Sequence, residues 1–175
     1  MVPDTASQTL PAQSRNLLLR RPEITDGAHI HALIAACPPL DINSVYLYLI
    51  LCHHFKDTCV VACDGDRLVG FVSGYIPPQQ PDVFFVWQVA VHADARGHGL
   101  GTAMLQHLLQ RPGISAVRYF HSTVSPSNQA SRAMFERFAR KFGVEIQEKP
   151  LFTRSMFGAN AEHEDEILLI IGPLN

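Results

Sequence analysis

The most informative stretch of the sequence is Val-Ala-Val-His-Ala-Asp-Ala-Arg-Gly-His-Gly-Leu-Gly-Thr, residues 89–102. An apolar run over residues 84–91 leads into it, and a helical pattern follows it up to an Arg-Pro-Gly stop at residues 111–113. Between strand and helix lie Arg96 and three glycines at alternate positions, Gly97, Gly99 and Gly101. Glycine lets the backbone approach a ligand closely, and the first N–H groups of a helix lack intrahelical partners. The stretch therefore predicts an anion-binding turn at a helix N-terminus, suited to a phosphate.

Two common phosphate-binding motifs are excluded by the order of these residues. No Gly-Lys-Ser or Gly-Lys-Thr follows, so the turn is not a P-loop. The dinucleotide fingerprint is also excluded, because no acidic residue ends a second strand about twenty residues further on. The order resembles instead the acetyl-CoA motif of the GCN5-related N-acetyltransferases, (Gln/Arg)-x-x-Gly-x-(Gly/Ala), whose three fixed places are filled here by Arg96, Gly99 and Gly101.

This resemblance implies how acetyl-CoA, the expected co-substrate, is held. In the family the preceding strand holds the pantetheine arm through its backbone, which here belongs to Val89 and Val91. We also expect the Val89 N–H to polarise the thioester carbonyl. The family binds the CoA pyrophosphate with the amides of the turn, which here are those of Arg96, Gly97, His98, Gly99, Leu100, Gly101 and Thr102.

A second family motif stands at residues 128–138. The preceding Ser-Pro-Ser-Asn predicts a helix start, and apolar residues then recur at about helical spacing as far as Phe142. The family places a cofactor-contacting Asn where Asn128 stands. It often places a Tyr seven residues later, as the acid that reprotonates the CoA thiolate. That position holds Phe135, which is expected beside the cofactor but cannot donate a proton, so the family's proton-transfer scheme cannot be carried over intact.

The composition is that of an ordinary soluble globular protein, with 175 residues, a net charge of −2 and 47% hydrophobic residues. We expect a flexible polar tail over residues 1–16 and a single domain over residues 17–175. No basic stripe indicates a nucleic-acid partner, and no apolar run reaches the ~18 residues that a membrane span needs. The chain opens without a secretion signal, so a cytoplasmic location is expected.

The four cysteines and nine histidines do not form a pattern typical of a metal site. No two cysteines have Cys-x-x-Cys spacing, and the histidine pairs have no matching cysteine or carboxylate cluster. We therefore expect reduced core cysteines and no metal.

The order of the expected elements indicates the fold class. Strands are predicted over residues 17–20, 58–63, 68–76, 84–91, 117–123, 144–152 and 167–171. Helices are predicted from residues 25, 43, 100 and 128. This is the element order of the N-acetyltransferase fold, an α/β (α+β) fold with a mixed central sheet of about six to seven strands flanked by about four helices.

Four segments near the expected acceptor pocket resemble a narrower group of the family, the members that acetylate L-2,4-diaminobutyrate on the route to ectoine. They lie at residues 39–46, 52–62, 81–91 and 163–168. The most specific parts are Leu-Asp-Ile-Asn-Ser-Val-Tyr at residues 40–46 and Val-Trp-Gln-Val-Ala-Val at residues 86–91. The resemblance implies transfer of the acetyl group to N4 of diaminobutyrate. Dimers are common in the family, and a late strand could pair across subunits, so a homodimer is the partner state considered.

The chemistry of a diamino acid suggests which residues bind it. An ammonium is recognised by carboxylates and by aromatic faces, which assigns Asp41 or Glu166 to the α-ammonium and Trp87 to a cation–π contact. Trp87 is expected on the same strand face as Val89, beside the thioester. His163, or a water relayed from Glu166, is the expected base that deprotonates the attacking amine.

The substrate carboxylate needs donors, which Asn43 and Ser44 could supply, and the predicted acceptor site is completed by Tyr46 and Gln88. Each assignment has a structural alternative. Asp41 could only cap the second helix, Trp87 could belong to the core, and the late acidic residues could form a solvated loop. Two other functions also stay open: acetylation of another small diamine or amino acid, and a degenerate CoA-binding module, which Phe135 alone favours.

Overall fold

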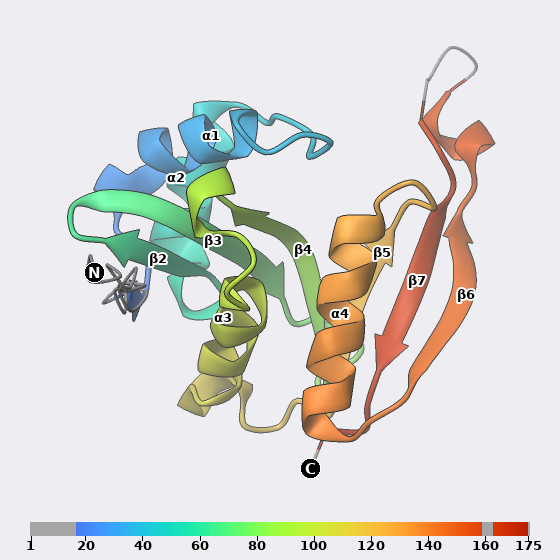
Figure 1. The fold of residues 1–175 in the computed structure, drawn as a ribbon. Helices are drawn as coiled ribbons and strands as arrows, with labels where there is room; N and C mark the ends of the chain where they lie inside the picture. Colours follow the sequence, from blue (N-terminus) through green and yellow to red (C-terminus); the bar gives the residue numbers. More distant parts are fainter. Residues whose placement is uncertain (1–16, 159–162, 175) are drawn as a thin grey trace, which may run out of the picture.

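The computed structural model describes residues 17–158 and 163–174 (Figure 1). The tail expected over residues 1–16 lies outside the described residues. One sheet is built from seven strands: β1 (Leu17–Arg20), β2 (Val60–Asp64), β3 (Arg67–Tyr75), β4 (Val83–Val91), β5 (Tyr119–Val124), β6 (Ile146–Phe152) and β7 (Glu166–Ile171). The α-helices are α1 (Gly27–Ala35), α2 (Val45–His54), α3 (Leu100–Leu109) and α4 (Gln129–Phe142). Short 3-10 turns are η1 (Ile24–Asp26), η2 (Lys56–Thr58), η3 (Ala93–Ala95), η4 (Pro112–Ile114) and η5 (Arg154–Phe157).

The sheet has the strand order β1-β2-β3-β4-β5-β7-β6. Every neighbouring pair is antiparallel except β4 and β5, which run parallel. A mixed sheet of seven strands with four α-helices among the described residues confirms the predicted fold class.

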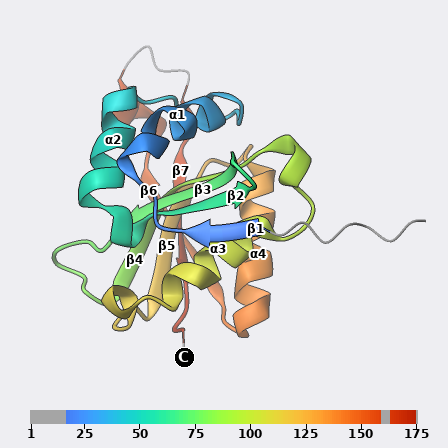
Figure 2. The same cartoon turned by 90° about the vertical axis from the view of Figure 1, so that its left-hand side faces the viewer.

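Two helical layers cover the sheet, and each closes its own core. On one face α1 and α2 pack on a cluster that includes Val61, Phe71 and Ala90. On the other face α3 and α4 pack on a larger cluster that includes Phe84 and Phe120. Figure 2 shows α1 and α2 above the sheet and α3 below it. All four cysteines are buried free thiols, which confirms the expectation of reduced core cysteines.

The parallel pair β4–β5 is short, and this opens the sheet. Val83 to Phe85 pair with Tyr119 to His121, and the pairing ends there while β4 continues to Val91. The two strands therefore separate on the side where β4 leads into the glycine-rich turn. The gap leaves backbone groups of β4 without a strand partner on that side.

The strand β4 also carries a β-bulge at Trp87. Gly74 pairs with Val86 and Ser73 with Gln88, so Trp87 is the extra residue. The side-chain alternation restarts there, and Val86 and Val89 both pack against the larger core cluster. The simple alternation on which a common face for Trp87 and Val89 was expected is therefore interrupted.

Helix starts follow the predicted caps. The Asn128 side chain accepts a hydrogen bond from the Ser131 N–H (3.1 Å) at the start of α4, and Ser44 Oγ accepts one from the Leu47 N–H (3.4 Å) at the start of α2. Asp26 precedes α1 but makes no cap to that helix; its carboxylate accepts hydrogen bonds from Arg20 instead.

Candidate active site

The glycine-rich turn forms an open cradle at the start of α3. Gly99 is the residue before the helix and has a φ of +73°, and Gly97 has a φ of +82°. Within the described residues, no atom beyond the glycine and its two chain neighbours lies within 4 Å of where a Cβ would stand on either residue. The space over the turn is therefore free for a ligand, and the N–H groups of the first turn of α3 point into the region of positive helix dipole.

Gly101 has a different reason to be glycine. A Cβ on Gly101 would lie 2.7 Å from Met134 Sδ on α4. The residue thus permits α3 and α4 to approach each other closely beneath the cradle. The sequence pattern alone could not separate this packing role from ligand binding.

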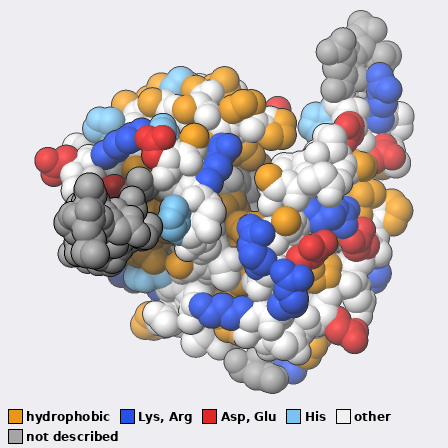
Figure 3. Space-filling model, in the orientation of Figure 1, with side chains coloured by type: hydrophobic (Ala, Val, Ile, Leu, Met, Phe, Trp, Pro, Cys, Tyr) orange, Lys and Arg blue, Asp and Glu red, His pale blue; other side chains and the backbone are white. Residues whose placement is uncertain are grey.

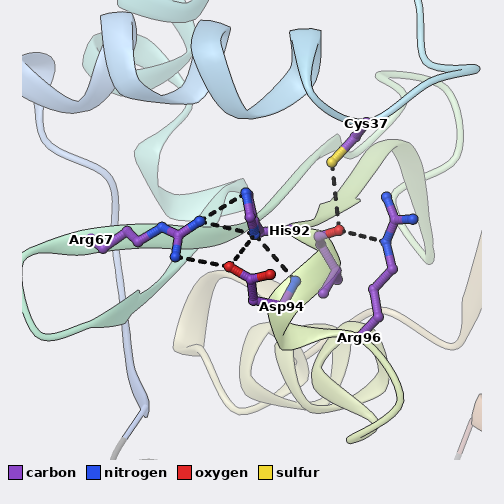
Figure 4. Close-up of polar contacts among 6 residues, drawn as sticks. Cys37, Arg67, His92, Asp94 and Arg96 are labelled. Carbon is purple, nitrogen blue, oxygen red and sulfur yellow. Dashed lines mark hydrogen bonds and ion pairs between the residues drawn. The ribbon is translucent and has the colours of Figure 1, made fainter.

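The turn is fastened to the end of β4 at the Val91 carbonyl. This oxygen accepts a hydrogen bond from Arg96 Nε (2.9 Å) and one from Cys37 Sγ (3.5 Å), which brings the loop after α1 to the same point (Figure 4). The adjacent turn η3 is held by Arg67, whose guanidinium pairs with Asp94 (3.0 Å) and contacts the His92 ring. The cradle is therefore braced from β3 as well as from its own strand.

The backbone of β4 presents Val89 and Val91 to the gap. The His92 N–H donates to the Val69 oxygen on β3 (2.9 Å), and backbone groups alternate along a strand. The groups of Val89 and Val91 accordingly face away from β3, toward the side where pairing with β5 has ended at Phe85. A peptide-like arm could pair there with the backbone groups of Val89 and with the Val91 N–H, since the Val91 oxygen already accepts from Arg96 and Cys37.

A cavity of about 330 Å³ joins these features. Its walls are the loop Cys37–Leu40, the end of β4, the glycine-rich turn and one face of α4. Of the residues predicted to bind the cofactor, nine line it: Val89, Val91, Arg96, Gly97, Gly99, Leu100, Gly101, Thr102 and Asn128. Figure 3 shows the surface hollowed beside α4, with basic side chains gathered over that helix.

Two of the predicted cofactor residues do not line this cavity. His98 is exposed on the turn, where its Nδ1 lies 2.7 Å from the Arg96 oxygen. Phe135 is 2% exposed and belongs to the larger core cluster, because α4 turns that side of its surface toward the sheet. The position that holds a Tyr in many family members is thus a packing position here.

Several cavity residues were missed in the sequence. On α4 these are Ala130, Ser131, Ala133, Met134 and Arg137, and on the loop after α1 they are Cys37, Pro38, Pro39 and Leu40. Ser131 and Met134 follow Asn128 at steps of three residues, so helical periodicity counted from Asn128 could have found them. No local signal connects the loop to the cradle, because the two meet only through tertiary packing.

A second group of predicted residues converges from two segments that are far apart in the sequence, one at Asp41 and one at His163 and Glu166. His163 Nε2 lies 4.0 Å from Asp41 Oδ2 and 3.9 Å from Glu166 Oε1. The His163 ring is stacked on Phe157, with a centroid distance of 3.9 Å. The Glu166 side chain is 17% exposed and that of Asp41 is 84% exposed, so one carboxylate is enclosed and the other is accessible.

The hydrogen bond of His163 defines its neutral tautomer. Its Nδ1 lies 2.8 Å from the Glu164 carbonyl oxygen, which can only accept, so Nδ1 carries the proton. Nε2 of the neutral ring then holds a lone pair, directed toward the space between the two carboxylates. This arrangement can take up a proton and stabilise the resulting charge.

The other predicted acceptor residues are placed as follows. Gln88 is buried, and its side chain contacts the Asp41 carbonyl and Tyr48. Trp87 is 42% exposed at the bulge and Tyr46 is 70% exposed on α2. Ser44 caps α2, and Asn43 is half-buried just before that cap.

No group of three or more His, Cys, Asp or Glu side chains within residues 17–158 and 163–174 is arranged to hold a metal ion. In the same ranges, no helix has the length and apolar character to cross a membrane.

Comparison with known proteins places these features in a family. The profile of the "Acetyltransferase (GNAT) family" matches residues 28–139. A curated L-2,4-diaminobutyric acid acetyltransferase of Bordetella parapertussis is 54% identical over 164 residues, covering 93% of this chain and 88% of that protein. Another from Chromohalobacter salexigens is 41% identical, covering 98% of this chain and 88% of that protein.

Solved structures agree. Diaminobutyrate acetyltransferase EctA from Paenibacillus lautus, in complex with its substrate L-2,4-diaminobutyric acid and coenzyme A, superposes with a TM-score of 0.88 at 39% identity, covering 91% of this chain and 96% of that one. An acetyltransferase from Thermus thermophilus shares the fold alone, with a TM-score of 0.60 at 13% identity, covering 88% of this chain and 95% of that one. The resemblance noted in the sequence is thereby confirmed: the chain belongs to the GNAT family and, within it, to the L-2,4-diaminobutyric acid acetyltransferases.

Proposed function

We propose that this chain transfers the acetyl group of acetyl-CoA to the N4 amine of L-2,4-diaminobutyrate, giving N4-acetyl-L-2,4-diaminobutyrate and CoA in the synthesis of ectoine. The observation that carries the proposal is that one loop connects the two sites. The loop that walls the cradle cavity, Cys37–Leu40, leads directly into Asp41, which lies beside His163 and Glu166. An anion cradle for the donor therefore adjoins a carboxylate–histidine cluster suited to a diamine.

On the donor side, backbone groups carry the binding. The amides from Arg96 to Thr102 hold the CoA pyrophosphate, because Gly97 and Gly99 leave the space above them open. The backbone of Val89 and Val91 pairs with the pantetheine arm in the gap beside β4, and Asn128 closes the cavity from α4. Arg137, which lines the same cavity, adds a cationic group that the sequence reading did not include.

On the acceptor side, the attacking amine must lose a proton. Deprotonating an alkyl ammonium with a pKa near 10.4 at pH 7 costs about 4–5 kcal/mol. In the proposed reaction Asp41 and Glu166 hold the α-ammonium, Nε2 of His163 accepts the proton of the γ-amine, and the Val89 N–H donates to the thioester oxygen. The enclosed Glu166 stabilises the imidazolium that forms, since it lies 3.9 Å from Nε2.

The remaining acceptor residues orient the substrate. Asn43 and Ser44 bind its carboxylate at the start of α2, and the exposed faces of Trp87 and Tyr46 contact its ammonium groups. Gln88 contributes from β4 through its contact with the Asp41 carbonyl.

Thiol release from acetyl-CoA tests the proposed acceptor. Purified protein should release CoA rapidly with L-2,4-diaminobutyrate and far more slowly with ornithine, lysine or polyamines. Equal rates would overturn the acceptor and leave an acetyltransferase of broader specificity. Binding of CoA without turnover of any amine would favour a degenerate CoA-binding module, the alternative that Phe135 raised.

The proposal extends to assembly and location. Strand β6 is at the edge of the sheet, and it and η5 carry exposed apolar side chains at Leu151 (37%), Phe152 (44%), Met156 (67%) and Phe157 (40%). Pairing of two copies through this edge would cover them and give a homodimer. Light scattering coupled to gel filtration should find a dimer that Met156→Asp weakens, and a monomer at all concentrations would contradict it.

The four free thiols favour a reducing compartment, the cytoplasm.

A further inference from the structure

Gln88 is held on both sides by buried contacts. The residue is 4% exposed on β4. Its Nε2 donates to the Asp41 carbonyl oxygen (3.0 Å), and its Oε1 accepts from the Tyr48 hydroxyl (3.4 Å). Tyr48 is 0% exposed on α2. The Gln88 amide thus bonds other protein groups through both its oxygen and its nitrogen, whereas a substrate-binding amide would have one of them directed into the site.

The Asp41 carbonyl belongs to the loop that joins the two proposed sites. This loop touches β4 at two points, through the Cys37 thiol on the Val91 oxygen (3.5 Å) and through Gln88 on the Asp41 oxygen (3.0 Å). The two attachment points on β4 lie on either side of Val89. The loop at residues 37–41 is therefore held at a fixed position relative to Val89, whose N–H faces the proposed acetyl-CoA site.

The side chain of Asp41 projects from this fixed backbone. It is 84% exposed, and its Oδ2 lies 4.0 Å from His163 Nε2. An exposed carboxylate on an irregular loop has little of its own to hold it, so its place depends on where its backbone is fastened. The only hydrogen bond found for that carbonyl within the described part of the chain comes from Gln88.

We propose that Gln88, steadied by Tyr48, is a positioning residue that fixes Asp41 relative to Val89 and thereby sets the diamine against the thioester. The inference rests on the proposed function for the identity of the diamine. It replaces the direct substrate contact expected for Gln88 from the sequence. Tyr48 donates to the Gln88 side chain and is thus the first member of a relay that runs from Tyr48 through Gln88 to the Asp41 backbone.

A neighbouring position offers a matched control. Ser73 pairs with Gln88 across β3 and β4, is 0% exposed, and its Oγ has no hydrogen-bond partner among the described residues. Ser73→Ala therefore removes a buried hydroxyl next to the relay without removing any of its bonds. Ser73→Ala should leave the KM for diaminobutyrate and the KM for acetyl-CoA unchanged.

The first experiment is a double-mutant cycle on the purified enzyme. Gln88→Leu should raise the KM for diaminobutyrate about tenfold, the effect of losing one buried hydrogen bond, with the KM for acetyl-CoA changed less than about twofold. Tyr48→Phe should raise the same KM by a smaller factor. In an Asp41→Ala background, Gln88→Leu should add almost nothing, because the carboxylate that Gln88 positions through the backbone is gone. Equal factors in both backgrounds, or a parallel rise of both KM values, would overturn the proposal.

The second experiment does not depend on activity. Amide hydrogen exchange over residues 37–44 should become faster in Gln88→Leu and in Tyr48→Phe, and stay unchanged in Ser73→Ala. Unchanged exchange over residues 37–44 in both Tyr48→Phe and Gln88→Leu would overturn the positioning role. This outcome counts even if Gln88→Leu is poorly folded in another part of the molecule. A wild-type protein inactive on diaminobutyrate would refute the proposed function, while exchange would still decide whether Gln88 holds the loop.

Discussion

Single residues in the cradle divide the work of binding and packing between them. Gly97 and Gly99 have positive φ and open space above them, whereas Gly101 has its nearest neighbour, Met134 Sδ, 2.7 Å from a built Cβ. The same residue type therefore leaves open space at two positions and permits a helix–helix contact at the third. Phe135 shows the converse, since a position that often carries chemistry in the family is occupied by a core side chain.

Gly99→Asp tests the cradle at this scale. The substitution places a carboxylate where the pyrophosphate is proposed to bind, so the KM for acetyl-CoA should rise at least tenfold through charge repulsion. It also strains the backbone by roughly 1–2 kcal/mol, because an L residue adopts this φ poorly. The strain must be separated from the charge effect.

Gly143→Asp supplies that separation. Gly143 ends α4 with a φ of +65°, with no other atom within 4 Å of a built Cβ, and it does not line the cavity. The Gly143→Asp variant should lower the melting temperature about as much as Gly99→Asp does, but it should leave the KM for acetyl-CoA unchanged. Steady-state kinetics and thermal unfolding of the two variants provide the measurement. An equal rise of the KM for acetyl-CoA in Gly99→Asp and in Gly143→Asp would contradict binding of the pyrophosphate at the cradle.

At the scale of elements, the entry into α1 depends on one ion pair. Arg20 at the end of β1 donates two hydrogen bonds to Asp26, at 2.7 and 2.9 Å, and the Asp26 side chain is 10% exposed. Burial by itself raises the pKa of Asp26, but hydrogen bonds from Arg20 and from the Glu23 N–H outweigh it and hold that pKa below its usual value. The pair thus connects the first strand to the helix that precedes the loop of the site.

This pair predicts a pH-dependent stability. A carboxyl with a lowered pKa in the folded state stabilises the fold fully above its unfolded value of about 3.9, and the contribution is lost as pH falls through the folded pKa. Asp26→Asn should therefore lower the free energy of unfolding by about 1–3 kcal/mol at pH 7, with the difference from wild type shrinking below about pH 4.

Denaturant titrations of both proteins across this pH range provide the measurement. Asp57→Asn is the control, because Asp57 pairs with Arg21 at 2.6 Å where both side chains are more than half exposed. It should change the stability by less than about 1 kcal/mol at any pH. An equal loss in the two variants would show that burial of Asp26 adds nothing.

At the scale of the whole molecule, the proposed donor site depends on segments that are far apart in sequence. The cavity is walled by a loop near residue 40, the end of β4, the turn before α3 and the face of α4. A ligand that contacts all of them binds the folded chain and not the unfolded one, so it stabilises the entire fold.

Thermal unfolding with CoA should reveal this coupling. At a concentration of 100 times Kd, CoA should add about 2.7 kcal/mol to the stability, which corresponds to a rise in Tm of roughly 5–10 °C. Gly99→Asp should abolish the rise at the same concentration, and Gly143→Asp should keep it. An equal rise in all three proteins would place CoA binding elsewhere on the molecule.

Much of this architecture was readable from the sequence, because the signals are local. The strand–turn–helix at residues 89–102 follows from apolar periodicity and from glycines a few positions apart. The caps at Ser44 and Asn128 each bond a backbone N–H three residues away. The predicted element order was confirmed because each element depends on a pattern within a short stretch of chain. The mixed sheet, expected from the family resemblance, was confirmed together with the family.

The remaining features were decided by tertiary structure. The bulge at Trp87 arises from pairing with β3, and it interrupts the alternation that a sequence reading assumes. Gln88 could only be recognised as a brace once Tyr48 and the Asp41 carbonyl were placed around it.

The strand, the turn and the helix of the cradle follow from local sequence, since each is specified by residues within a few positions of one another. The distance of 4.0 Å between Asp41 and His163 and the orientation of Phe135 toward the core arise from tertiary packing. Those outcomes depend on how strands pair and helices pack over more than a hundred residues of chain. Local periodicity carries no information about contacts at that separation.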